Sequence, residues 1–340
     1  MPVENFDELF DRKRLIQAGL GFVVAVAVIG FIAASVGIDD LTRILSDAQL
    51  RWIALGCVST AICLVAWARA WQVVLGVVGI PVKFRRLVVT YFAATFANYV
   101  TPLGQAGGEP FIAYVLSRDT EASYEDSLAS VVTADLLNLF PFFSFAGIGF
   151  AALLYNASLP ARVRPLALGL AAMAAGVPLI AVGTWRFRFR VGRFVLRVAE
   201  PIVARVPRLT IDSLRRRMSE LNASFERIAG DPRALVRALF YSYVGWVFFA
   251  LPLYFAGLAL ETPIPLLLAF FIVPASTLAG LVPSPGGLGA VEGALLILLV
   301  AVAGLSQPTA FAAALVYRVE SYVFALALGG IGALWVIGRN

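Results

Sequence analysis

The sequence predicts an all-α polytopic membrane protein, a helix bundle arranged as an inverted repeat with two broken or re-entrant hairpins. Of its 340 residues, 60% are hydrophobic and only 14% are charged, whereas soluble domains carry about 25% charged residues. Most of its apolar runs reach the roughly 20 residues that cross a bilayer as a helix. Two motifs rich in glycine and proline interrupt these runs, and such motifs break a continuous helix.

The apolar runs, taken in order, give the expected membrane helices. The run 15–36 follows basic residues, but the acidic residues before them are unlike a signal peptide, so we expect a retained helix. The further runs are 52–79, 87–102, 111–116, 128–155, 166–185, 234–260, 264–283, 291–305 and 309–337. We expect 87–116 and 264–305 to be hairpins that return to the side where they start, whether they are re-entrant or fully spanning.

Basic residues orient these helices in one transmembrane domain that covers 1–340. Of the 27 Lys and Arg residues, 13 are arginines between Arg186 and Arg237, and a segment of this charge stays in the cytoplasm. We therefore expect 185–233 to be a cytoplasmic or interfacial segment and both termini to lie on the cytoplasmic side of the cell membrane. Anionic lipid headgroups explain this basicity better than nucleic acid does, because membrane helices adjoin the segment.

The two halves of the chain show a weak sequence repeat. At an offset of 183 residues, 102–109 aligns with 285–292. Each half, 50–155 and 233–338, reads as a long helix, a broken hairpin and a long helix, and the two halves start on opposite sides. This order is typical of the inverted repeats of secondary transporters, whose site lies between the halves at the midplane. The alternative is a compositional bias shared by two glycine- and proline-rich hairpins.

The two broken motifs, 101–110 and 283–292, are the sharpest signals for a site. Non-helical backbone at membrane depth persists only where protein buries it or where it lines a cavity. A helix that begins there presents free N–H groups and the positive end of its dipole, which suit an anionic phosphate headgroup. We expect a helix to begin near Glu109, with Pro110 in its first turn. The glycines that let a headgroup approach the backbone are Gly104, Gly107, Gly108, Gly286, Gly287 and Gly289.

Six ionisable side chains lie within the apolar runs or at their breaks. Each costs roughly 2.5–3.5 kcal/mol at the centre of a membrane helix, so all of them should face the protein interior or a wet cavity. Asp135 and Arg318 are equivalent at the offset of 183, and we expect them to form an ion pair. In the alternative, Arg318 pairs with Glu292 or Glu109. The six residues are Arg69, Glu109, Asp135, Glu292, Arg318 and Glu320.

The positions of three of these residues indicate roles. Glu109 and Glu292 stand at the breaks, where they would bind an ammonium headgroup, carry a coupling proton or cap a helix; capping alone is the alternative. Arg69 lies near the inner end of its helix, between Trp67 and Trp71. For it we favour a snorkelling side chain with interfacial tryptophans over a contact with phosphate.

Several kinds of chemistry are excluded. The sequence has no histidine, so a histidine base and a histidine-ligated zinc or haem are impossible. Both cysteines, Cys57 and Cys63, lie in one apolar run and are expected to be free thiols rather than a disulfide or a zinc site. The sequence shows no Walker A motif, metal-site pattern or nucleophile–base pair. We therefore expect no enzyme activity, no cofactor and no bound metal.

The motifs also carry a family resemblance. They read P-x-G-x-x-G-G-E-P at 102–110 and P-x-P-G-G-L-G-x-x-E at 283–292, and Tyr317-Arg318 follows. Nearly the whole chain resembles the lysylphosphatidylglycerol synthase transmembrane region, the flippase-like domain of the multiple peptide resistance factor. The resemblance implies a bundle with two re-entrant pairs that moves a lipid between leaflets. The residues to which it assigns the lipid site are Glu109, Glu292 and Arg318.

We expect this chain to differ from larger members of that family in having no synthase or glycosyltransferase domain. We expect an integral membrane flippase or scramblase for a phosphate-bearing lipid, either a phospholipid or a polyprenyl-phosphate-linked lipid, with a separately encoded enzyme as a candidate partner. One alternative is a proton- or ion-coupled transporter of a small anion, with a narrow cavity closed to lipid. The other is a non-catalytic membrane partner of a lipid-modifying enzyme.

Overall fold

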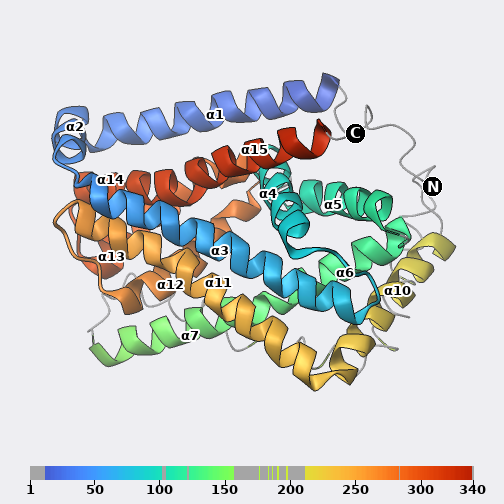
Figure 1. Cartoon of the computed structure of the whole chain (residues 1–340). Helices are drawn as coiled ribbons and strands as arrows, with labels where there is room; N and C mark the ends of the chain where they lie inside the picture. The colour runs from blue at the N-terminus through green and yellow to red at the C-terminus, as the bar shows by residue number, and fades with distance from the viewer. Residues whose placement is uncertain are drawn as a thin grey trace.

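A computed structural model gives a bundle of α-helices (Figure 1). It describes residues 12–101, 105–120, 122–156, 211–282 and 284–338, and the single positions 176, 183, 186, 190 and 197. The earlier helices are α1 (Arg12–Val36), α2 (Ile38–Ser46), α3 (Leu50–Val77), α4 (Phe84–Val100), α5 (Gln105–Asp119), α6 (Tyr124–Leu137) and α7 (Leu139–Asn156). The later ones are α10 (Ile211–Gly230), α11 (Pro232–Ala259), α12 (Leu266–Thr277), α13 (Ala290–Ala303), α14 (Gln307–Arg318) and α15 (Phe324–Ile337). Three short elements join them, the 3₁₀ turns η2 (Leu278–Leu281) and η3 (Pro285–Gly287) and the π-helical turn η4 (Val319–Val323).

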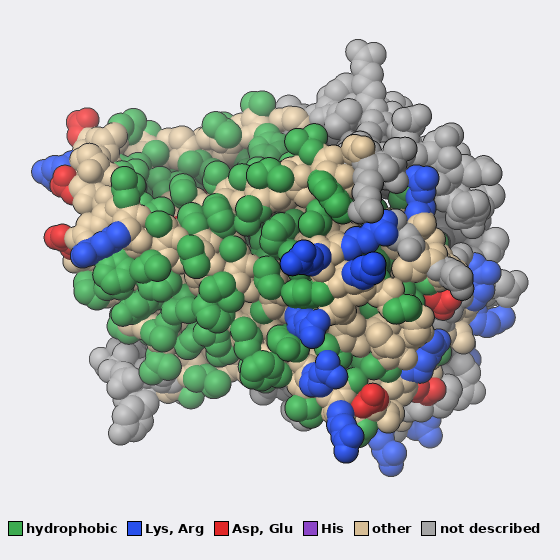
Figure 2. All heavy atoms as spheres, in the orientation of Figure 1, with side chains coloured by type: hydrophobic (Ala, Val, Ile, Leu, Met, Phe, Trp, Pro, Cys, Tyr) green, Lys and Arg blue, Asp and Glu red, His purple; other side chains and the backbone are tan. Residues whose placement is uncertain are grey.

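Long apolar helices confirm the predicted polytopic membrane protein. In the described part of the chain, 5 helices are long and apolar enough to cross a membrane, and the bent pair of α1 and α2 makes up to 6. Figure 2 shows hydrophobic side chains over a broad band of the visible face, with charged side chains gathered toward the two ends. Basic side chains dominate the end that carries α10. The predicted run 166–185 lies outside the described residues.

The two longest helices, α3 and α11, pack against each other along their length. Near one end the backbone N–H of Gln49 donates to the carbonyl oxygen of Ala259, with an N–O distance of 2.9 Å. Further along, the hydroxyl of Ser59 donates to the carbonyl oxygen of Phe248 at 2.7 Å. Residue numbers rise along one helix as they fall along the other, so the two helices are antiparallel. Such hydrogen bonds from small polar residues help to hold membrane helices together.

The two predicted hairpins are pairs of short helices in opposite halves of the bundle. Figure 1 shows α4 and α5 in the half that carries α10, and α12 and α13 in the half that carries α2. The four helices have 17, 15, 12 and 14 residues, fewer than the roughly 20 that span a bilayer, although η3 and α13 together form a run of 19. The structure does not test the inverted symmetry of the two halves, which stays a prediction.

Helix α15 packs so closely on α4 that it joins the end of the chain to the first hairpin. A Cβ atom on Gly329 would lie only 2.6 Å from the carbonyl oxygen of Phe92, and one on Gly332 would lie 3.0 Å from that of Val89. Glycines spaced in this way let the backbones of membrane helices approach. The segment that carries Arg318 is therefore continuous with a helix fixed on α4.

Some boundaries differ from the sequence prediction. Helix α2 was not expected; the chain bends by 96° between α1 and α2, at Gly37 with φ 99°. The run 128–155 is divided into α6 and α7 at Asn138. The expectation that a helix begins near Glu109 is wrong, because α5 begins at Gln105 and Pro110 lies inside it. Glycine costs only about 1 kcal/mol within a helix, so the glycines of this motif do not prevent the earlier start.

Candidate functional site

The second break forms a tight turn between η2 and α13, and glycine makes this turn possible. Gly286, Gly287 and Gly289 have φ values of 57°, 68° and 84°, a region that residues with a Cβ rarely adopt. A Cβ atom on Gly286 would overlap the ring of Tyr322. The turn therefore brings polar backbone groups directly against the segment that joins α14 to α15.

Arg318 is bound to this turn. Its Nε donates to Oε1 of Glu292 at 2.7 Å, and its Nη2 donates to the carbonyl oxygen of Gly286 at 2.9 Å. The guanidinium carbon lies 4.2 Å from the centre of the Tyr322 ring, a distance that allows a cation–π interaction. The side chain of Arg318 is 12% exposed and that of Glu292 is 1% exposed. We call Arg318, Glu292, Gly286 and Tyr322 the arginine cluster.

Glu292 has two roles in this cluster. Its Oε2 accepts the backbone N–H of Gly289 at 2.6 Å, which satisfies one of the free donors at the start of α13. Its Oε1 holds Arg318. The capping role and the alternative Arg318–Glu292 pair are thus both present in the structure, and the buried carboxylate has partners on both oxygens.

The expected Asp135–Arg318 ion pair is wrong. Arg318 pairs with Glu292, and the partners that the structure gives Asp135 are Trp71 and Glu109. The offset of 183 makes Asp135 and Arg318 equivalent in sequence, but it does not place the two side chains face to face. Arg318 reaches Glu292 instead because the turn of the second break places the start of α13 against the end of α14.

The arginine cluster also touches the end of the first hairpin. The hydroxyl of Tyr322 donates to the carbonyl oxygen of Tyr99 at 3.3 Å, and the two rings lie 4.8 Å apart. Tyr99 is the penultimate residue of α4 and closely precedes the first motif. The two hairpins, far apart in sequence, therefore meet at the arginine cluster.

A second group, the carboxyl pair of Glu109 and Asp135, lies between α5 and α6. The two carboxyl groups interact electrostatically, and the indole Nε1 of Trp71 donates to Oδ1 of Asp135 at 2.9 Å. The pair therefore brings two carboxyl groups close together inside the bundle.

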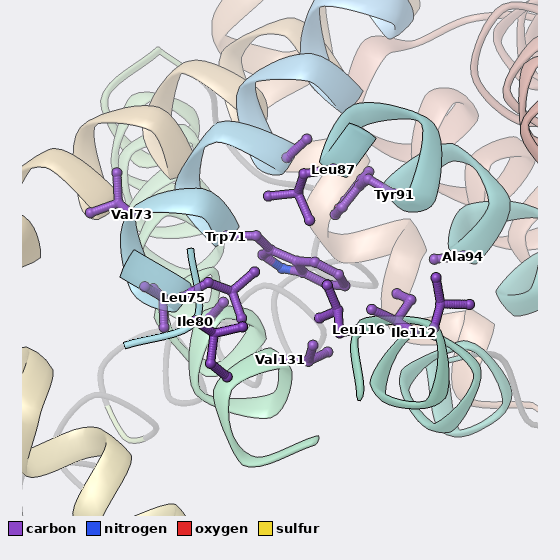
Figure 3. Packing of buried hydrophobic residues seen from close by; sticks show 14 of the residues in the cluster. Trp71, Val73, Leu75, Ile80, Leu87, Tyr91, Ala94, Ile112, Leu116 and Val131 are labelled. Carbon is purple, nitrogen blue, oxygen red and sulfur yellow. The ribbon is translucent and has the colours of Figure 1, made fainter. Parts of the chain in front are cut away.

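Trp71 supports the carboxyl pair from the hydrophobic core. Figure 3 shows its ring among Leu87, Ile112, Leu116 and Val131, which come from α4, α5 and α6. Trp71 is only 3% exposed. The expectation that Trp71 is an interfacial anchor is thus wrong, because its indole N–H is used inside the protein and its ring fills the junction of four helices.

Two of the predicted site residues lie apart from both groups. Arg69 donates from Nη1 to Oε1 of Gln72, and its guanidinium lies 5.0 Å and 5.9 Å from the ring centres of Phe84 and Tyr241. Glu320 is completely buried in η4, on α3. Whether Arg69 snorkels or contacts a phosphate stays a prediction.

The predicted glycines are divided between the two hairpins. Gly286, Gly287 and Gly289 form the turn of the second break. Gly107 and Gly108 lie in the first turn of α5, and Gly104 lies outside the described residues. Across the described ranges, no group of three or more His, Cys, Asp and Glu residues could hold a metal ion.

Sequence reasoning missed Tyr99 as a member of the site. Its signal was present, since an aromatic residue with a polar tip stands directly before a glycine- and proline-rich break. Such residues pack their rings and still hydrogen-bond at one end. Tyr322 is likewise absent from the predicted site residues, although it joins the two hairpins through Tyr99 and Gly286.

Comparison with known proteins agrees with the family resemblance that the motifs carry. A family model described as the lysylphosphatidylglycerol synthase transmembrane region matches residues 19–329. A UPF0104 membrane protein of Methanothermobacter thermautotrophicus is 29% identical over 96% of this chain and 94% of its own length. A second protein of that organism with the same description is 26% identical over 90% of this chain and 92% of its own length. One from Pyrococcus horikoshii is 24% identical over 91% of this chain and 94% of its own length.

Proposed function

The chain belongs to the family of lysylphosphatidylglycerol synthase transmembrane regions, and from this premise we propose that it is a flippase or scramblase that moves a phosphate-bearing lipid between leaflets. The observation that carries the proposal is Arg318, which lies where the two broken hairpins meet. A guanidinium at membrane depth is rare and marks a functional site. Its fork of donors fits a phosphate group well.

Arg318 keeps donors for a ligand. A guanidinium has five N–H donors, and the structure shows Nε on Glu292 and Nη2 on Gly286. Glu292 and the ring of Tyr322 hold the group in place, so little freedom is lost when it binds a ligand. The start of α13 adds free N–H groups and the positive end of a helix dipole beside it.

Helix α1 supports a lipid rather than a soluble anion as the cargo. Its Val28 lies beside Gly289 at the second break. On the same helix Val24 and Phe31 are 55% and 75% exposed. Helix α1 is therefore close to the second break on one side and exposes apolar side chains on its outer side. This arrangement suits lateral entry of a headgroup whose acyl chains stay in the bilayer. Large apolar side chains are also exposed on other helices, as expected for a surface that faces lipid.

The distribution of charge supports a cytoplasmic location for the end that carries α10, and with it both termini. We expect the Ser46→Cys variant, changed in α2, to react with an impermeant maleimide added outside intact cells. The Ala229→Cys variant, changed in α10, should react only after the membrane is opened. Both positions are exposed, and the background would carry Cys57→Ala and Cys63→Ala. The reversed labelling pattern would contradict this orientation.

The test of function is lipid translocation in proteoliposomes that contain only this protein. Headgroup-labelled phospholipids and polyprenyl phosphates would be followed with an impermeant quencher. We expect Arg318→Ala to slow translocation about tenfold or more, since a hydrogen bond to a charged group is worth about 1.5–3 kcal/mol and about 1.4 kcal/mol is a factor of ten. Arg318→Lys keeps the charge but loses the fork, and should be intermediate.

The matched control is Arg43→Ala, because Arg43 is an exposed arginine in α2 with a surface partner, Asp40. We expect its translocation rate to equal that of the wild type. Translocation that is indifferent to Arg318 in a folded variant would refute the assigned site. A wild-type protein that moves no lipid but takes up a labelled soluble anion would refute the flippase proposal and support the anion transporter instead.

A further inference from the structure

Glu320 is a buried carboxyl group with no part in the arginine cluster. It is 0% exposed, and within the described structure neither of its carboxyl oxygens has a hydrogen-bond partner. It lies in the π-helical turn η4, and its carboxyl group rests on Gly56 of α3, where a Cβ atom would overlap it. π-Helical turns occur frequently at functional sites.

Among the residues that the structure describes, the ionisable groups near Glu320 offer no compensating positive charge. From α3, the thiol of Cys57 faces it. The two hydrogen bonds of the α3–α11 pair place Leu251 or Pro252 level with Gly56, and Tyr254 is the nearest ionisable residue of α11 in sequence. On its own segment, Glu320 has Tyr317 and Tyr322 as neighbours in sequence, and Arg318 is engaged with Glu292.

The position of Arg318 explains why it does not serve Glu320. Residues two apart on a helix point to nearly opposite sides, because each residue turns by about 100°. Arg318 therefore faces the second break, whereas Glu320 faces α3. The segment from α14 to α15 thus carries Arg318 on the side of the second break and Glu320 on the side of α3.

Ionisation of Glu320 in this buried place has a high free-energy cost. A charged group at the centre of a membrane protein costs several kcal/mol unless it is paired, and it takes a proton instead. A metal cation does not fit the site, since cations such as Ca²⁺ and Mg²⁺ require about six oxygen ligands, and within the described structure Glu320 belongs to no group of three or more His, Cys, Asp and Glu residues that could hold one. A proton is the ligand that this environment accepts.

We propose that Glu320 is a proton-binding site that couples lipid translocation to a proton gradient. The inference rests on the proposed function and names its energy source. In the state described here the carboxyl group holds a proton and packs against α3. When η4 moves and the group meets water, the proton leaves to the aqueous phase on that side and the carboxylate remains, so each cycle carries one proton and changes no other covalent bond.

The first test detects the protonation state of Glu320 and does not depend on transport. Infrared difference spectra of the purified protein, recorded between neutral and alkaline pH, should contain the carbonyl stretch of a protonated carboxyl group, and Glu320→Gln should remove one such band. The matched control, Glu261→Gln, changes an exposed glutamate at the end of α11 and should leave the band in place. Identical spectra for wild type and Glu320→Gln would refute the proton site, whether or not the protein moves lipid.

The second test measures coupling in proteoliposomes with the membrane potential clamped. A pH difference of one unit corresponds to about 1.36 kcal/mol, so with one proton per lipid it should drive up to a tenfold ratio of labelled phospholipid between the leaflets. Glu320→Gln should bring the lipid to equal amounts on both sides, and Glu261→Gln should behave as the wild type. Equal distribution already in the wild type, with translocation intact, would overturn the coupling while leaving the flippase function standing.

Discussion

Replacing Glu292 by alanine should lower the free energy of unfolding by about 3–5 kcal/mol, because removal of one partner leaves the other charge of a buried pair uncompensated. Glu292 is 1% exposed and Arg318 is 12% exposed. The substitution also returns the N–H of Gly289 to an unsatisfied state. The measurement is denaturant unfolding in detergent micelles, followed by circular dichroism and by tryptophan fluorescence.

A double-mutant cycle separates the charge from the packing. Arg318→Met removes the charge that the loss of Glu292 would otherwise leave unpaired in the protein interior. We expect Glu292→Ala with Arg318→Met to be more stable than Glu292→Ala alone, because an apolar pair carries no desolvation cost. If the two substitutions simply added their costs, the arginine cluster would not be a coupled pair and its structural role would have to be abandoned.

Trp71→Ala should cost about 3–5 kcal/mol in an otherwise wild-type chain, the usual range for an aromatic residue removed from a well-packed core. Its ring fills the junction of α3 with the three helices packed around it (Figure 3). Trp71→Phe keeps most of the ring but loses the bond to Asp135. Its smaller cost of about 1–3 kcal/mol would be that of an unsatisfied carboxyl oxygen.

Trp335→Ala is the matched control, since Trp335 is 46% exposed and its replacement should cost much less than Trp71→Ala. Unfolding in the same micelles compares the three variants directly. Equal costs at the two positions would mean that Trp71 does not support the core around the carboxyl pair. A Trp71→Phe variant as damaging as Trp71→Ala would assign the effect to the hydrogen bond rather than to packing.

Hydropathy and helix-breaking residues predicted most of the fold. The long helices appear near their expected places because each is an apolar run of sufficient length, and the second break appears at its glycines because their φ values exclude other residues. The bend at Gly37 and the division at Asn138 were not predicted. Asn138 lies inside the apolar run 128–155, and hydropathy measures the environment of a segment rather than its direction. Helix α2 follows the end of the run 15–36 and carries Asp39, Asp40 and Arg43, so it is too polar to be predicted as a membrane helix.

The partners of the charged residues were the part that sequence could not settle. Equivalence in a repeat gives Asp135 and Arg318 similar depth, but pairing depends on which face of each helix turns inward. The π-helical turn at Glu320 rotates the side chains further, because its backbone hydrogen bonds join residues five apart instead of four. No residue type in the sequence marks such a turn. Only a three-dimensional structure shows that Arg318 and Glu320 face different neighbours.

The segment from α14 through η4 to α15 is one continuous helix. Arg318 and Glu320 project from opposite sides of this helix: Arg318 points into the turn of the second hairpin, and Glu320 points onto α3. A rotation of this helix about its own axis that moved Arg318 away from Gly286 would also move the carboxyl group of Glu320 over Gly56. We therefore expect the two sites, on opposite sides of one helix, to respond together to such a rotation.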